Sequence, residues 1–289
     1  MLDKNIMKKL TFLQKGEITD YLIYTKLAKK QKSEHNQSIL NKIAEDELGH
    51  YEFLKHHTNK TIKQNHFKVM FFFIIARFLG LTFGIKLMER GEEKTQAIYH
   101  ELLGKVEGIQ SLIDDEERHE KELINALDEE KLNYIGSIVL GLNDALVELT
   151  GTLAGLTFAF AEAKAVALAG LITGIAASLS MGSSEYLSTK QESSHSFALK
   201  SALYTGVAYI FAVIFMILPY LLINNVYLSL AVTIGVVILI IFVFNYYISV
   251  AKDLSFRKRF LEMVSISLGV ALISFGIGVL VKEVIGIDI

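Results

Sequence analysis

Two Glu-x-x-His motifs are the most specific chemical signal in this sequence. They are Glu47 with His50, and Glu116 with His119. On a helix, residues three apart project from the same face, so each motif aims a carboxylate and an imidazole at one place. Carboxylate oxygens and imidazole nitrogens together suit iron or manganese, and the chain contains no cysteine that could offer a thiolate. The two motifs therefore predict a transition-metal site.

Glutamates on two further helical stretches complete a ligand set. An early apolar stripe that includes Leu13 and Tyr24 is interrupted by Glu17, and a later one between Phe78 and Tyr99 is interrupted by glutamates as well. Burying a carboxylate without compensation costs on the order of several kcal/mol, and a shared metal would compensate all of them. The predicted metal ligands are Glu17, Glu47, His50, Glu89, Glu92, Glu116 and His119.

The alternative is that these acids simply face solvent on charged helices. Two Glu-x-x-His motifs in phase with apolar stripes, and acids in phase on two more helices, argue against it. Several neighbouring acids are out of phase and are expected to face solvent, where some could guide cations inward. They are Glu45, Asp46, Glu93, Asp114, Asp115, Glu117 and Glu120.

The elements that must position these ligands are four helices. A carboxylate-bridged di-iron bundle takes Glu from two helices and Glu-x-x-His from the other two. The predicted fold class is therefore all-α, with a four-helix bundle in residues 1–130 followed by a membrane domain in residues 131–289.

The first half resembles the ferritin-like family in its rubrerythrin branch. The resemblance covers roughly Asp3 to Glu130 and rests on the seven predicted ligands. It implies a di-iron centre, with manganese as a possible substitute, that oxidises Fe(II) with O₂ or peroxide. Rubrerythrins also carry a cysteine-ligated iron that delivers electrons, which a chain without cysteine cannot build. Peroxidase turnover by that route is therefore not expected.

The second half has the composition of a membrane protein. The chain is 52% hydrophobic and 21% charged, but the charged residues are concentrated in the first 133 residues. Stretches of about 20 mostly apolar residues are long enough to cross a bilayer. Five such spans are predicted, at Tyr134–Phe160, Ala165–Leu187, Ala198–Leu222, Tyr227–Val250 and Val264–Val284.

Lysine and arginine in the short loops predict the orientation. The loops after the second and fourth spans are the basic ones, carrying Lys190, Lys200, Lys252 and residues 257–259. This pattern puts the N-terminal domain in the cytoplasm and the C-terminus outside, in a prokaryotic plasma membrane.

One apolar segment, Val69 to Leu87, does not fit the span pattern. It contains Arg77 and Lys86, which are costly inside a true span, and a sixth span would break the orientation rule. We expect a buried helix of the first domain that touches the membrane surface at most.

Four residues inside the spans have the chemistry of a cation path. Asp144 and Glu148 lie four apart in the first span, and Met181 and Glu185 lie four apart in the second. At ~1.5 Å per residue, Glu185 falls near the inner surface, Met181 deeper, and the first two near the midplane. A thioether beside carboxylates favours a transition metal over Mg²⁺ or Ca²⁺. The G-x-x-x-G pairs 151/155 and 170/174 predict close packing between these two spans.

The stretches at residues 141–147 and 180–188 resemble the two signature stretches of the vacuolar iron transporter family. The resemblance covers about Leu132 to Ile289, and five spans is that family's number. It implies a homodimer that exchanges Fe(II), sometimes Mn(II), for protons. By matching position it assigns the metal path to Asp144 and Met181 and identifies Glu185 as the acid of the second stretch. Glu148 is supported by the physical argument alone. The whole layout resembles the membrane-bound ferritin subgroup.

The resulting hypothesis is an exporter of cytosolic Fe(II) whose bundle binds, senses or oxidises iron. One rival is a membrane-anchored di-iron ferroxidase or peroxidase without transport, and a second is a metal sensor or scaffold. A net charge of −2 argues against a nucleic-acid partner.

Overall fold

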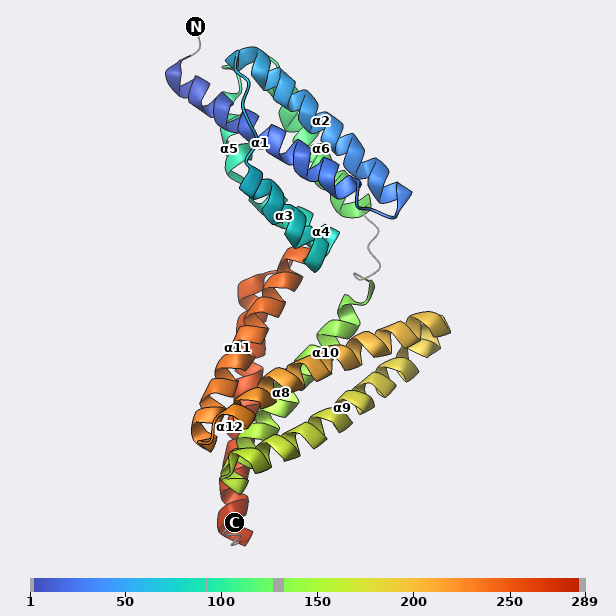
Figure 1. The fold of residues 1–289 in the computed structure, drawn as a ribbon, viewed down its shortest axis with the longest axis vertical. Helices are drawn as coiled ribbons and strands as arrows, with labels where there is room; N and C mark the ends of the chain where they lie inside the picture. The colour runs from blue at the N-terminus through green and yellow to red at the C-terminus, as the bar shows by residue number, and fades with distance from the viewer. Residues whose placement is uncertain (1–2, 92, 127–132, 286–289) are drawn as a thin grey trace. The chain divides into compact units, whose positions relative to one another are not determined.

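The computed structural model describes all residues except 1–2, 92, 127–132 and 286–289. The described residues form eleven helices and no strand, which confirms the all-α fold class (Figure 1). The contacts divide the chain into two compact units, Met1–Glu129 and Glu130–Ile289, and each is described by itself.

The first unit is built on two long helices, α1 (Lys4–Ala28) and α2 (Glu34–Thr58), which lie side by side (Figure 1). The hydroxyl of Ser33 accepts a hydrogen bond from the Asn36 amide and so caps the start of α2, and Asn59 ends that helix in the left-handed conformation. The unit continues with α3 (His66–Leu79), α4 (Leu81–Arg90), α5 (Glu93–Leu102) and α6 (Ile109–Ala126).

The third helical stretch is not one helix, contrary to the single stripe expected from Phe78 to Tyr99. Gly80 takes a φ of 109° that side chains disfavour, and it separates α3 from α4. A Cβ on Gly84 would lie 2.6 Å from the Cβ of Ala76, so the two short helices pack back on each other in close contact. Phe78 is consequently 77% exposed instead of lying in the core.

The expectation of a buried helix over Val69–Leu87 holds for α4 and is wrong for α3. Almost every residue from Leu81 to Met88 is buried. In α3 only Val69 and Ala76 are buried, and most of the other apolar side chains are exposed. Hydrophobicity alone did not reveal which apolar helix packs against protein.

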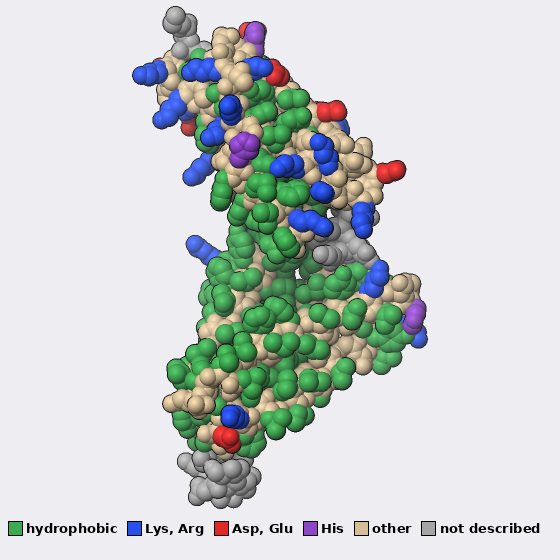
Figure 2. Space-filling model, viewed as in Figure 1, with side chains coloured by type: hydrophobic (Ala, Val, Ile, Leu, Met, Phe, Trp, Pro, Cys, Tyr) green, Lys and Arg blue, Asp and Glu red, His purple; other side chains and the backbone are tan. Residues whose placement is uncertain are grey.

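The second unit consists of five long apolar helices, which confirms the predicted spans. They are α8 (Ile135–Phe160), α9 (Ala163–Glu192), α10 (His195–Leu222), α11 (Val226–Ala251) and α12 (Phe256–Ile285). Each contains a segment long and apolar enough to cross a bilayer. On the face drawn in Figure 2, hydrophobic side chains cover this unit and most charged side chains gather on the first unit.

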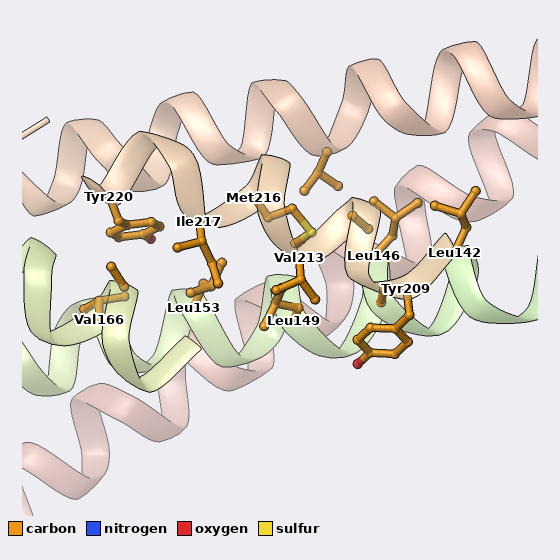
Figure 3. Packing of buried hydrophobic residues seen from close by; sticks show 14 of the residues in the cluster. Leu142, Leu146, Leu149, Leu153, Val166, Tyr209, Val213, Met216, Ile217 and Tyr220 are labelled. Carbon is orange, nitrogen blue, oxygen red and sulfur yellow. The ribbon is translucent and has the colours of Figure 1, made fainter. Parts of the chain in front are cut away.

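Buried side chains of α8, α9, α10 and α11 form the core of the second unit, part of which is drawn in Figure 3. Leu149 and Leu153 of α8 face a row on α10 that includes Val213, Met216 and Ile217. The buried Tyr220 shares a 2.7 Å hydrogen bond with Thr157, so its hydroxyl is satisfied away from water. This core fixes α8, the helix that carries Asp144, against its neighbours.

The small residues of α8 and α9 promote close packing, but not mainly with each other. A Cβ on Gly151 would lie 2.8 Å from Ser274, and one on Gly155 would lie 3.3 Å from the Ser274 carbonyl oxygen, so this pair faces α12. Gly174 of α9 faces Val213 of α10, and only Gly170 meets α8, at Leu153. The two spans do contact each other, as predicted, but the 151/155 pair packs on α12, because a stripe of small residues does not specify its partner helix.

Candidate metal sites

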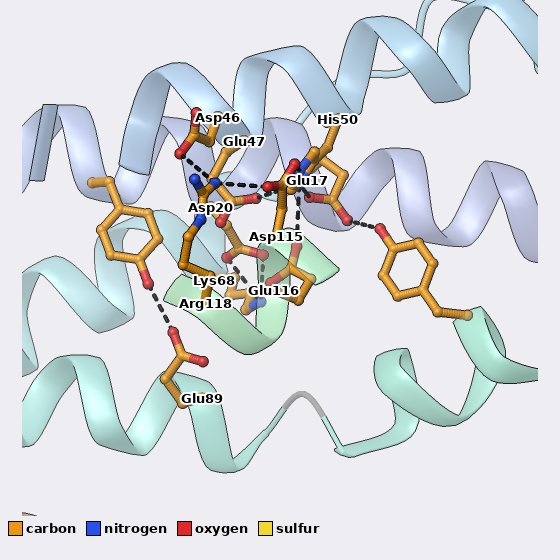
Figure 4. Close-up of polar contacts among 12 residues, drawn as sticks. Glu17, Asp20, Asp46, Glu47, His50, Lys68, Glu89, Asp115, Glu116 and Arg118 are labelled. Carbon is orange, nitrogen blue, oxygen red and sulfur yellow. Dashed lines mark hydrogen bonds and ion pairs between the residues drawn. The ribbon is translucent and has the colours of Figure 1, made fainter. Parts of the chain in front are cut away.

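Three helices of the first unit bring four predicted ligands together (Figure 4). They are Glu17 of α1, Glu47 and His50 of α2, and Glu116 of α6, and their ligand atoms all lie within 4.8 Å of one another. His50 Nδ1 lies 3.2 Å from Glu116, 3.6 Å from Glu17 and 3.9 Å from Glu47. Three carboxylates thus converge on one imidazole nitrogen.

Helical periodicity explains the convergence. Glu47 and His50 are three residues apart on α2 and share the side of that helix that carries Leu40, Ile43 and Leu54. Glu17 occupies the corresponding place among the buried residues of α1. Glu17, Glu47 and His50 are 4–6% exposed, and Glu116 is half-buried. An acidic cluster this deep needs a cation, or protons in its place.

Burial and the contacts within the cluster shift the pKa values of its side chains. Burial opposes a charge on His50, but hydrogen bonds to Glu116 and Glu17 outweigh it and raise the pKa of His50 to about 10. Burial and then repulsion from Glu116 and Glu17 raise the pKa of Glu47 well above its ordinary value. Burial also acts to raise the pKa of Glu17, but hydrogen bonds with His50 and Glu47 lower it overall. At neutral pH, therefore, His50 holds a proton that a bound metal would displace, and the raised pKa of Glu47 makes that carboxyl harder to ionise in the metal-free fold.

Two supporting residues were not anticipated as part of the site. The hydroxyl of the buried Tyr99 of α5 donates a hydrogen bond to Glu17 Oε1. Asp115 Oδ2 lies 3.4 Å from His50 Nε2, so this carboxylate touches the site although its side chain is 39% exposed, as its phase suggested. Partners of this kind orient ligands and adjust their basicity. Tyr99 was visible in the sequence only as a member of an apolar stripe.

A cavity of about 360 Å³ adjoins the cluster. Its walls include Glu17, Glu47 and Glu116, and also Asp20, which is held by Lys68 at 3.0 and 3.3 Å. Burial raises the pKa of Asp20 to about 6, although the Lys68 ammonium opposes that shift. Asp20 was missed as a site residue, yet it lies three residues after Glu17 and so shares its helix face.

Of the remaining predicted ligands, the structure describes only the side chain of Glu89. Glu89 accepts a 2.8 Å hydrogen bond from the Tyr24 hydroxyl and lies apart from the four ligands (Figure 4). Glu92 and the side chain of His119 lie outside the described residues. The described residues thus present one four-ligand group, and a second metal position stays a prediction.

In the second unit, Glu185 of α9 is tied to the first turn of α8. Ser137 Oγ donates a 2.7 Å hydrogen bond to Glu185 Oε1, and the Thr189 hydroxyl contributes a longer one of 3.4 Å. Met181 lies one turn before Glu185 on α9 and packs, partly buried, against the core. The two predicted path residues of α9 therefore lie on the part of that helix that is anchored to α8.

Asp144 and Glu148 lie one turn apart in α8. Asp144 is half-buried, whereas Glu148 is exposed and accepts a 3.0 Å hydrogen bond from the buried Tyr209 of α10. Ionisable groups in a span face a partner, a bundle interior or a water-filled path. Tyr209, which supplies that partner here, was not singled out in the sequence because nothing in its local pattern distinguishes it.

Comparison with known proteins supports a membrane assignment for the second unit. A model of the VIT family matches residues 135–199 and 193–279. No curated protein matched the chain. The matched region begins at the start of α8 and contains all four residues predicted to line the cation path.

Proposed function

The chain belongs to the VIT family, and we propose that it moves Fe(II), with Mn(II) as the other cation its donors suit, out of the cytosol in exchange for protons. Membership indicates membrane transport of a metal ion, and the five apolar helices make the protein an integral membrane protein. The proposal adds the identity of the ion, the coupling to protons, and a prokaryotic plasma membrane with the first unit in the cytoplasm.

The observation that carries the proposal is the arrangement of polar groups along α8 and α9. The hydrogen bond between Ser137 and Glu185 sets these two residues at the same level. Asp144 follows Ser137 by seven residues, which is about 10 Å along the helix, and lies about 14 Å from the start of α8. That is close to the middle of a hydrocarbon core of about 30 Å. Glu185, Met181 and Asp144 thus form a series of donors from one surface toward the midplane.

Carboxylates and a thioether are suitable donors for a partly dehydrated Fe(II) or Mn(II) ion. The same carboxylates can bind protons when the metal has left, which offers a simple route for proton exchange. Glu148 would add a further acid at this depth, held by Tyr209.

Exposure of an acid on a membrane-spanning helix supports a homodimer. Glu148 is exposed in a single chain although it lies one turn beyond the near-midplane Asp144. Lipid contact at that depth is costly for a carboxylate, so a second copy that covers this face and encloses a path between the two chains would remove the cost.

We further propose that the first unit is a ferritin-like di-iron domain that captures metal before transport. The buried donor set of Glu17, Glu47, His50 and Glu116 fits iron or manganese, because it combines hard oxygen ligands with imidazole and lacks thiolate. A bound metal would supply the positive charge that balances these carboxylates. Tyr99 would hold Glu17 in position, and Glu92 and His119 would serve a second metal.

Metal flux into proteoliposomes tests the transport proposal. Vesicles loaded with a metal-sensitive fluorophore and containing the full chain should respond to external Fe(II) or Mn(II) much faster than empty vesicles, and an imposed proton gradient should change the rate. No flux above that of empty vesicles, for either metal and with either sign of gradient, would contradict it.

The anchored ferroxidase is the second candidate, and the buried four-ligand cluster is the observation that favours it. On this alternative the detergent-solubilised chain would consume O₂ or peroxide while oxidising Fe(II), and the same protein in vesicles would show no flux. Flux without oxidation would instead identify the bundle as a site that only binds or senses metal.

A further inference from the structure

The outward face of α3 is a continuous apolar stripe. Phe67 and Phe78 are 79% and 77% exposed, and the residues between them on the same face are exposed as well. The stripe consists of Phe67, Met70, Phe71, Ile74 and Phe78, whose spacing of three or four residues places them along one side of the helix. Exposed apolar patches of this kind mark interaction sites.

The opposite side of α3 is fixed to the unit. Val69 and Ala76 are buried in the same core cluster as Ile23 and Tyr24 of α1. At the start of the helix, Asn65 Oδ1 accepts hydrogen bonds from the amides of Phe67 and Lys68, and the Asn65 amide donates to the Thr19 hydroxyl. The stripe is therefore presented by a well-anchored helix.

The charges beside the stripe are positive. The sequence of α3 contains no aspartate or glutamate, and Arg77 is exposed near its end. The exposed Lys26 of α1 lies with Nζ 3.6 Å from Met70 Sδ and 5.9 Å from the centre of the Phe73 ring. Lysine and arginine beside an apolar face are typical of helices that lie in the interfacial layer of an anionic bilayer, with their charged ends among the headgroups.

The length of α3 determines how it could meet a membrane. Fourteen residues extend only about 21 Å, which is too short to cross a hydrocarbon core of about 30 Å. The five spans of the second unit also keep a bilayer within reach of the first unit, so a weak apolar contact gains from a high local concentration of lipid. A soluble partner protein that is not tethered to the chain has no such advantage.

We propose that α3 binds the surface of the bilayer that the chain's own spans cross, with the stripe from Phe67 to Phe78 immersed at the boundary between headgroups and acyl chains. The occupant of the stripe is thus phospholipid. This inference depends on the membrane unit being in a bilayer and does not depend on which ion is carried.

The chain has no tryptophan, so a single introduced one reports on its own surroundings. The full-length Phe71→Trp variant in nanodiscs containing phosphatidylglycerol should lose most of its emission when the acyl chains are brominated, because bromine quenches only on contact. Phe78→Trp provides an independent position on the same stripe. Leu103→Trp is the matched control, since it is also exposed but adjoins a different core cluster; its emission should be the same in both lipids.

Equal emission of the Phe71→Trp and Phe78→Trp variants in brominated and ordinary lipid would overturn the proposal. Protein would then cover the stripe, and a single cysteine introduced by Ile74→Cys would be expected to cross-link two copies. Quenching of Leu103→Trp as strong as that of the stripe variants would also overturn it, because it would show lipid contact without selectivity for α3.

Discussion

Ser137 of α8 donates a 2.7 Å hydrogen bond to the carboxylate of Glu185 on α9. The bond joins the beginning of one membrane helix to the later part of the next, so it fixes how the donors on the two helices are staggered. Ser137 is buried and Glu185 is partly buried, which protects the bond from competition by water. The level of Glu185 relative to Asp144 is therefore set by a specific contact.

Replacing Ser137 with alanine should weaken metal uptake. Without the hydroxyl, Glu185 loses the partner that orients it, and the loss of such a supporting contact typically costs about tenfold or more in metal affinity. The apparent KM for metal flux in proteoliposomes should rise by that order. Ser183→Ala is the control, since Ser183 is exposed on the same helix and bonds only a backbone carbonyl of its own helix. Equal KM values for the two variants would argue against a role for the bond.

Removing two carboxylates from the bundle should abolish its metal binding. In Glu47→Gln with Glu116→Gln, shape is retained but two of the three carboxyl groups facing His50 Nδ1 are replaced by amides. The metal content of the full chain after equilibration with Fe(II) or Mn(II) should fall, whereas the fold should persist because repulsion among the buried acids is relieved.

The single variant Glu45→Gln is the control for that experiment, because Glu45 is exposed on the same helix. Unchanged metal content in the double variant would show that the four-ligand group is not a metal site.

Metal binding to the bundle should release protons. The pKa of His50 is raised to about 10, so at pH 7 His50 is protonated in the metal-free fold and must lose its proton to bind metal. The raised pKa of Glu47 acts in the same direction. Metal affinity should therefore increase with pH. A weakly buffered indicator dye measures the release directly, and binding without acidification would contradict the assignment.

The same pKa shifts predict how the metal-free fold depends on pH. Because the native state binds these protons more tightly than the unfolded state, its free energy of unfolding should fall as pH rises from about 6.5, the unfolded pKa of histidine, toward 10. Added metal should reduce that loss. If the free energy of unfolding of the metal-free bundle instead rises over this pH range, the raised pKa of His50 is contradicted.

Tyr99→Phe should lower metal affinity with little effect on the fold. The ring would still fill the core, but Glu17 would lose its hydrogen bond from the hydroxyl. We expect a loss of about tenfold in affinity, as for other residues that support metal ligands.

The matched control for Tyr99→Phe is Tyr51→Phe. Tyr51 is also buried in the bundle, but it donates to the carbonyl oxygen of Ile62, outside the ligand group. Equal affinities of the two variants would mean that Tyr99 does not position Glu17.

Periodicity and hydropathy predicted the elements well. Apolar length alone identified the five spans, because a bilayer demands about 20 apolar residues whatever the tertiary structure. The Glu-x-x-His motif at Glu47 predicted a buried pair because its spacing and the apolar stripe of α2 share one phase.

Contacts between residues of different helices could not be predicted in the same way. The turn at Gly80 and the exposure of Phe78 depend on how α3 folds back on α4, which hydropathy does not encode. Tyr99, Asp20 and Tyr209 became relevant only when distant helices brought them to an acid. Gly151 favours close packing, as its small size predicts, but the sequence did not indicate that its partner helix is α12.

Metal flux through an Asp144→Asn variant is the most direct test of the transport path. Asp144 lies near the middle of α8, where the proposed path needs a carboxylate for both the metal ion and the proton. Proteoliposomes with this variant should show at least about tenfold slower Fe(II) or Mn(II) flux than wild type, as expected when a charged ligand is neutralised. Asp253→Asn, in the loop between α11 and α12, should retain wild-type flux. Flux through Asp144→Asn as fast as through wild type would contradict the proposed path.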